Sequence, residues 1–226
     1  MAVLTSVSAR AASASPITIL DDFEDGTTEN WFAGGGPLGA VPPFPPSNIA
    51  NGGPLGAGDN YLQIVSSGGA GAGSRLVAMN ASQWALDYLA GGVLQIEMDV
   101  INLGTTDLAL RLLFEDPIAG PPSNMAISKD PIAVPSGSGW IHIVFPITPA
   151  DLVALLGSVT DALSNTTLLR VFHNPDATFP GPVLAATLGV DNITARVNVV
   201  VPEPAALLLV LSGVALVARR HRTRRL

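Results

Sequence analysis

Cysteine is absent from this chain of 226 residues. Its absence excludes a disulfide framework, a thiol nucleophile and a cysteine-ligated zinc site. Basic residues are scarce outside the C-terminus: five of the 11 Lys and Arg residues fall within the last eight positions, which leaves six against all 18 acidic residues. Because nucleic-acid binding depends on clustered Lys and Arg, the acidic body excludes nucleic acid as a partner.

Aromatic residues make up only 5% of the chain, whereas it contains 23 Gly and 19 Pro. This composition favours turns and short strands over long helices. Apolar segments separated by turn residues occur at residues 17–20, 61–65, 75–79, 93–101, 108–114, 141–147, 168–172 and 183–197. We therefore expect an all-β body, a jelly-roll-like β-sandwich with one short helix.

The segment 93–101 shows the clearest strand pattern, because its apolar and polar side chains alternate. Alternation predicts one buried and one solvated face. The positions expected to be buried are Leu94, Ile96, Met98 and Val100, and those expected to be solvated are Gln95, Glu97 and Asp99.

The expected helix follows Thr148, which is a suitable N-cap. Pro149 would occupy its first turn, Asp151 would lie near its positive end, and Gly157 would end it. The Pro- and Gly-rich segment Gly34–Gly58 is expected to be a long loop.

The C-terminus has an apolar run, Ala205–Ala218, followed directly by arginines. The run is short for a membrane span, and a buried C-terminal helix is the alternative. A core helix has no place for the arginines, whereas their stems can reach a membrane surface. We expect a single C-terminal transmembrane helix. Its orientation is set by the basic residues that follow it, which are expected on the cytoplasmic side: Arg219, Arg220, Arg222, Arg224 and Arg225.

Three parts of this tail, in order, carry a resemblance. Pro202, Glu203 and Pro204, then a short apolar helix, then an arginine cluster together resemble the PEP-CTERM sorting signal of Gram-negative bacteria. That resemblance implies recognition and processing near the Pro-Glu-Pro by an exosortase-like membrane transpeptidase. It also implies a transient stay at the inner membrane, then delivery to the cell surface or the extracellular matrix.

Such sorting requires export, but the N-terminus is a poor signal peptide. It lacks a basic start, its apolar stretch is very short, and Arg10 interrupts it. We expect residues 1–14 to be the remnant of a longer signal peptide, residues 15–198 the extracytoplasmic β-sandwich, and residues 199–226 the sorting signal. A disordered N-terminal tail is the alternative.

The body carries a second resemblance. The segments Leu20–Gly26, Asn30–Phe32 and Gly58–Leu62, with a final strand that contains Gly189–Ile193, are similar to jelly-roll carbohydrate-binding modules. The resemblance implies adjacent first and last strands that share a structural calcium ion. Calcium prefers carboxylate and carbonyl oxygens. The carboxylates expected to supply them are Asp22, Glu24 and Asp191.

Aromatic side chains are the expected contacts for sugars. Trp31 and Trp140 adjoin strands and are expected in the core, so Trp84 and Tyr88 are the candidate glycan contacts. No catalytic residues are assigned, and the histidines form no evident constellation. We expect a non-enzymatic envelope or matrix protein that binds exopolysaccharide or is embedded in it.

Two other functions stay open. One is a jelly-roll hydrolase or lyase acting on polysaccharide through Glu97 or Asp99, which are expected to share a strand face. The other is an adhesion or matrix protein without a defined ligand.

Overall fold

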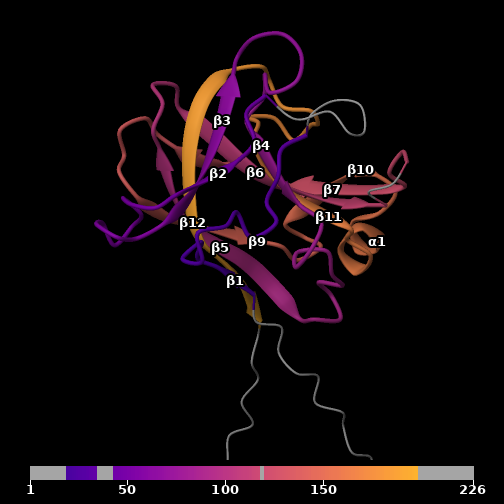
Figure 1. The fold of residues 1–226 in the computed structure, drawn as a ribbon. Helices are drawn as coiled ribbons and strands as arrows, with labels where there is room; N and C mark the ends of the chain where they lie inside the picture. The colour runs from indigo at the N-terminus through magenta and orange to yellow at the C-terminus, as the bar shows by residue number, and fades with distance from the viewer. Residues whose placement is uncertain (1–18, 35–42, 118–119, 198–226) are drawn as a thin grey trace, which may run out of the picture.

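The computed structural model describes residues 19–34, 43–117 and 120–197. They form two antiparallel sheets packed face to face (Figure 1). Sheet A has the order β2-β3-β12-β5-β9, and β1 also pairs with β12. Its strands are β1 (Leu20–Asp21), β2 (Ser47–Ile49), β3 (Tyr61–Ser67), β5 (Val93–Asn102), β9 (Ile141–Pro146) and β12 (Ala185–Val197).

Sheet B has the order β10-β7-β6-β11-β4, and β8 also pairs with β6. The helix α1 (Val159–Ser164) lies beside β7 and β10. The strands of sheet B are β4 (Val77–Asn80), β6 (Leu108–Asp116), β7 (Asn124–Ser128), β8 (Ile132–Val134), β10 (Leu152–Leu156) and β11 (Leu168–His173). The prediction of an all-β jelly-roll sandwich with one short helix is confirmed.

The alternation predicted for β5 is confirmed over most of its length. Ile96, Met98 and Val100 are fully buried between the sheets. Leu94, however, is 42% exposed, so its predicted burial is wrong. The register explains the difference: Arg196 pairs with Gln95 and Val197 with Val93, so Leu94 lies in a β-bulge that leaves it outside the ladder.

The predicted helix after Thr148 is wrong, because residues 152–156 form β10. Asp151 does accept hydrogen bonds from the Thr148 backbone N–H and hydroxyl, but the chain then pairs with β7, with Val153 opposite Ile127. Gly157, at φ +59, separates this strand from α1 instead of ending a helix. The hydroxyl of Ser158 caps α1 by accepting from the Asp161 N–H.

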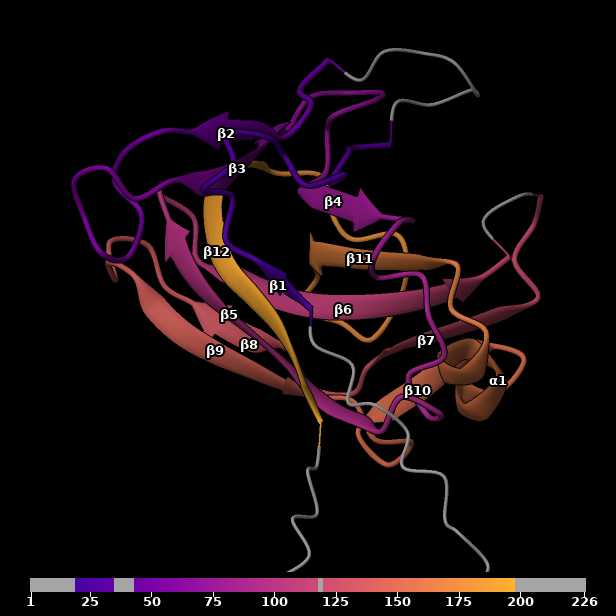
Figure 2. The same ribbon diagram turned by 60° about the horizontal axis from the view of Figure 1, so that its bottom comes forward.

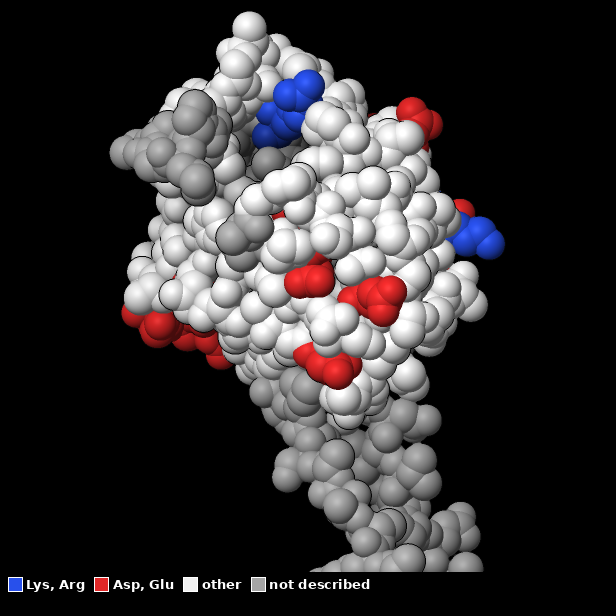
Figure 3. All heavy atoms as spheres, turned by 90° about the vertical axis from the view of Figure 1, so that its right-hand side faces the viewer, with Lys and Arg blue, Asp and Glu red and all other residues white. Residues whose placement is uncertain are grey.

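The main hydrophobic core lies between the two sheets and includes Trp31, as expected. A second apolar cluster occupies the other side of sheet B. It consists of Leu113, Met125, Ile127 and Phe172. The outward side of sheet B therefore carries a small apolar cluster. Figure 3 shows the side of the molecule with β7, β10 and α1: the acidic side chains near the middle of this view are separated by uncharged ones, and others gather at its lower left edge.

The first and last strands lie side by side, as the resemblance implied. Leu20 pairs with Thr194 and Asp21 with Ile193. The described chain thus begins and ends at one end of the sandwich, the lower end in Figure 2. Among the described residues no helix is long and apolar enough to cross a membrane. The transmembrane helix expected at 205–218 lies outside the described residues, as do the whole predicted signal remnant, 1–14, and the whole sorting signal, 199–226.

Candidate functional site

The outward face of sheet A presents its side chains in rows across β9, β5 and β12. The first row joins Ile101 and Gly189, with Trp140, the residue before β9, beside Gly189, and successive rows follow about 7 Å apart along the strands. The second row is His142, Asp99 and Asp191, the third is Val144, Glu97 and Thr194, and the fourth is Pro146, Gln95 and Arg196.

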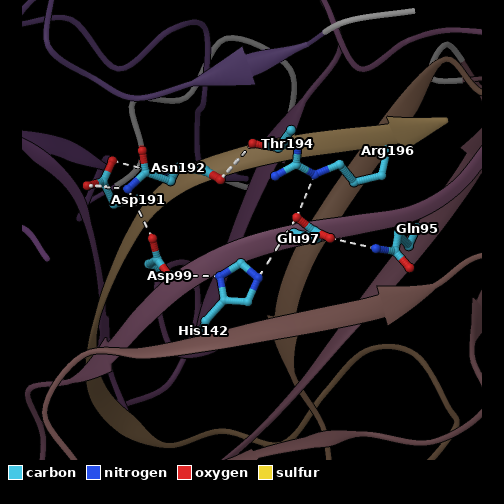
Figure 4. A network of polar contacts seen from close by, with 8 residues as sticks. All are labelled: Gln95, Glu97, Asp99, His142, Asp191, Asn192, Thr194 and Arg196. Atoms are coloured by element: carbon cyan, nitrogen blue, oxygen red, sulfur yellow. Dashed lines mark hydrogen bonds and ion pairs between the residues drawn. The ribbon is translucent and has the colours of Figure 1, made fainter. Parts of the chain in front are cut away.

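A continuous polar network runs through the second, third and fourth rows (Figure 4). His142 lies between two carboxylates, with Nδ1 at 2.9 Å from Asp99 Oδ1 and Nε2 at 3.9 Å from Glu97 Oε2. Glu97 also accepts hydrogen bonds from Arg196 Nε at 2.6 Å and Gln95 Nε2 at 2.5 Å. The prediction that Glu97 and Asp99 share one strand face is confirmed, and the structure adds His142, which sequence reasoning left out.

The electrostatics of Glu97 suit a hydrogen-bond acceptor. Its partial burial favours the neutral carboxyl, but the hydrogen bonds from Arg196 and Gln95, with the charges of Arg196 and His142, outweigh this and lower its pKa. A general acid for glycoside hydrolysis needs a raised pKa and a hydrophobic surrounding. Glu97 has neither, which disfavours the hydrolase alternative.

An aromatic pair covers the first row. Trp140 and Tyr61 meet edge to face with their ring centroids 5.4 Å apart. They lie over Gly189, where an added Cβ would stand 3.1 Å from Trp140 Cη2 and 3.1 Å from Tyr61 Cδ2. Trp140 Nε1 donates to the Gly52 carbonyl at 2.9 Å. Trp140 is partly exposed on this face, so its expected place in the core is wrong.

Trp84 and Tyr88 are not surface residues, and their predicted role as glycan contacts is wrong. Both are fully buried. Trp84 Nε1 donates to Asp21 Oδ2 at 2.7 Å, and the Tyr88 hydroxyl donates to the Trp84 carbonyl at 2.9 Å. Because both polar atoms find partners inside the protein, these rings can be buried completely.

A buried carboxylate organises this part of the core. Asp21 is 2% exposed and accepts hydrogen bonds from the indoles of Trp31 and Trp84, each at 2.7 Å, and from the amide of Gln83. Burial and then the charge of Asp21 raise the pKa of Glu29 from 4.5 to about 7. No local sequence signal identified this cluster, because its members are up to 63 residues apart.

The residues expected to bind calcium gather at one edge of the outward face. Asp22 and Glu24 line a hollow of about 390 Å³ together with Asp59 and Asn192. Asp191 is 1% exposed and accepts a hydrogen bond from the Asn192 N–H at 2.7 Å. Burial, then the charges of Asp59, Asp99 and Glu24, raise the pKa of Asp191 to about 7.

A calcium ion needs several oxygen ligands close together. In the part of the chain that the structure describes, no three His, Asp or Glu side chains lie close enough together to hold an ion. The carboxylates are crowded, however, and a cation would relieve their repulsion. Calcium binding therefore stays a prediction.

The residues predicted to direct sorting and topology lie outside the described residues. They are Pro202, Glu203, Pro204, Arg219, Arg220, Arg222, Arg224 and Arg225.

The fold is similar to those of solved carbohydrate-binding modules. The family 11 carbohydrate-binding module from Clostridium thermocellum, in complex with a β-1,3-1,4-mixed-linked tetrasaccharide, matches 81% of this chain and 98% of its own, with a TM-score of 0.53 and 16% identity. The family 11 module of a cellulosomal cellulase from Clostridium thermocellum matches 80% of this chain and 95% of its own, with a TM-score of 0.51 and 13% identity.

An exo-β-agarase matches 78% of this chain over 24% of its own length, with a TM-score of 0.52 and 14% identity. No family model and no curated protein sequence matches the chain. Since the identities are low, the structural similarity shows the fold alone: the described domain has the jelly-roll sandwich of carbohydrate-binding modules.

Proposed function

We propose that the described domain is a non-catalytic polysaccharide-binding domain of an exported envelope or matrix protein. The observation that carries the proposal is the outward face of sheet A, where planar polar side chains lie in rows beside an aromatic pair. Sugars offer hydroxyl groups at their rims and C–H groups on their ring faces, so a site for them needs hydrogen-bonding side chains and an apolar surface. The fold similarity supports the same function.

Binding without catalysis fits the chemistry of the carboxyls on this face. Glu97 is ionised and held by Arg196 and Gln95, which makes it an acceptor for hydroxyl groups and a poor proton donor. Hydrolysis or lysis by Glu97 or Asp99 is the second candidate function, since the two carboxyls share the face.

The tail supports export and sorting. Pro202-Glu203-Pro204, the apolar run and the arginines have the order of an exosortase-recognised signal. The described chain leaves sheet A at Val197, and Gly189 lies eight residues earlier on β12, or about 26 Å away at roughly 3.3 Å per residue. A domain held at its C-terminal end would therefore present the aromatic pair away from the point of attachment.

Gel electrophoresis through matrices that contain soluble polysaccharides tests the proposal. The purified chain should be retarded by at least one polysaccharide and should release no reducing ends from it. Retardation by none would overturn the proposal. Release of reducing ends that Glu97→Gln abolishes would instead establish the hydrolase function.

A further inference from the structure

We propose that the polysaccharide site is centred on Trp140 and its neighbours His142 and Asp99, and that it selects neutral polysaccharides. This inference rests on the proposed function and adds the position of the site and the chemical class of the ligand.

The position follows from how the sheet holds the aromatic pair. Gly189 provides the space: a Cβ there would approach Ile101 Cγ2 to 2.6 Å as well as both rings. The indole of Trp140 is held from three sides, by Gly189 beneath it, by Tyr61 at 5.4 Å between centroids, and by its hydrogen bond to Gly52. Tyr61 is 8% exposed, so Trp140 presents the accessible aromatic surface. A held ring loses little entropy when a ligand packs on it.

Groups for hydroxyl recognition adjoin this ring in the next row. His142, on β9, lies two residues after Trp140 and faces the same side, and 54% of its side chain is exposed. Asp99, with 22% of its side chain exposed, contacts both His142 and Asn192. The row therefore offers an acceptor carboxylate and an imidazole to hydroxyl groups beside the ring. A pyranose packed on Trp140 would place its rim over this row.

The charges on the face select the ligand class. Asp99 lies on the face, and the adjoining hollow adds Asp22, Glu24 and Asp59. On the described strands of sheet A, Arg196 is the one Lys or Arg residue, and Glu97 already neutralises it. Uronate or sulfate groups would meet uncompensated negative charge, whereas hydroxyl groups can donate to the carboxylates.

The aromatic pair has an alternative role, which is to anchor the loop at Gly52 to the sheet. Two variants separate these roles: Trp140→Leu removes both the aromatic surface and the indole donor to Gly52, whereas Trp140→Phe removes the donor and keeps an aromatic ring over Gly189. Binding that is lost in Trp140→Leu and kept in Trp140→Phe therefore comes from the aromatic surface. Phe179→Leu is the matched control: Phe179 is an aromatic residue with 37% exposure that packs on Phe172 of sheet B.

The experiment measures the affinity of the full chain for mixed-linkage β-glucan and agarose, as neutral probes, and for polygalacturonate, as an anionic probe. We expect wild type to bind a neutral probe and not polygalacturonate at low salt. Trp140→Leu should weaken binding at least about tenfold, and Phe179→Leu should leave it within about twofold. Melting temperatures are measured alongside.

Each contrary outcome has its own meaning. If Trp140→Leu leaves binding to the neutral probe intact, or if Phe179→Leu weakens it equally, the proposed position of the site is wrong but the proposed function stands. Preference for polygalacturonate would refute the inference that the site selects neutral polysaccharides. Binding to no polysaccharide overturns both proposals. If Trp140→Leu fails to fold, Gly189→Ala replaces it: this variant keeps both rings but displaces them, and unchanged affinity in a folded variant would overturn the site.

Discussion

A half-buried carboxyl, Glu29, and a buried one, Asp191, make the stability of this domain dependent on pH near neutrality. Burial and the charge of Asp21 raise the pKa of Glu29 from 4.5 to about 7, and burial with the charges of nearby acids raises that of Asp191 from 3.8 to about 7. In the unfolded chain both groups ionise at their ordinary pKa. The folded protein therefore binds more protons at intermediate pH, so stability is full below about pH 4 and is lost as the pH rises through about 7.

The size of the effect follows from the two pKa values. Each pH unit between the ordinary and the raised pKa corresponds to about 1.4 kcal/mol, which sets upper limits of about 3 kcal/mol for Glu29 and about 4 kcal/mol for Asp191. Solvent screening reduces these limits, and we expect roughly 3 kcal/mol for both together. For a domain of this size the melting temperature should fall by about 6–12 °C between pH 5 and pH 8.5.

Thermal unfolding followed by circular dichroism provides the assay, with Glu29→Gln/Asp191→Asn as the comparison. The amides keep the acceptors for the N–H groups of Phe23 and Asn192 but do not ionise. The double variant should therefore lose most of the pH dependence and be more stable than wild type at pH 8.5.

Other groups contribute little to this comparison. The pKa of Glu97 is lowered, so its contribution is lost only as the pH falls below about 4.5. Burial lowers the pKa of His173, which gives an opposite trend below pH 6.5 that both proteins share. A wild-type melting temperature that is constant or rises from pH 5 to 8.5, or a double variant that keeps the full slope, would refute the reasoning.

Three further predictions concern the ion, the core and the tail. Chelation should lower the melting temperature by several degrees, since calcium at about a hundred times its Kd adds about 2.7 kcal/mol to the free energy of unfolding. Asp191→Ala should abolish this response, and equal melting curves with calcium and with chelator would exclude the site. Trp84→Phe removes the N–H that donates to Asp21 and should cost about 1–3 kcal/mol in urea unfolding, whereas no loss would show that Asp21 finds another donor. Replacing Arg219, Arg220 and Arg222 with Glu should prevent normal processing in cells, visible as an uncleaved chain on immunoblots, and normal cleavage would contradict the sorting hypothesis.

The local pattern of the sequence was enough to predict the fold class and part of the site. Turn residues between short apolar segments indicated a sandwich, and alternation in β5 correctly placed Glu97 and Asp99 on one solvated face. Both features depend on neighbours in sequence, because side chains two residues apart on a strand necessarily point the same way.

Strand pairing lay beyond this local information. Residues 152–156 followed a good helix-capping signal, yet they form β10 because the edge of β7 offers them a ladder of backbone partners. His142 reached the candidate site only through the antiparallel register of β9 with β5, which sets it opposite Asp99. A register between distant segments leaves no mark in either segment alone.

Composition and local pattern were thus enough to predict an acidic, cysteine-free body of short alternating strands and a tail with the order of a sorting signal. Which tryptophans face solvent depends instead on contacts between distant segments. Trp84 is buried because its N–H meets the carboxylate of Asp21, 63 residues away, and Trp140 lies on the surface because Gly189 leaves room for its ring on the outer side of the sheet. An aromatic side chain suits either environment, so its place is set by the polar partner and the space that distant strands provide.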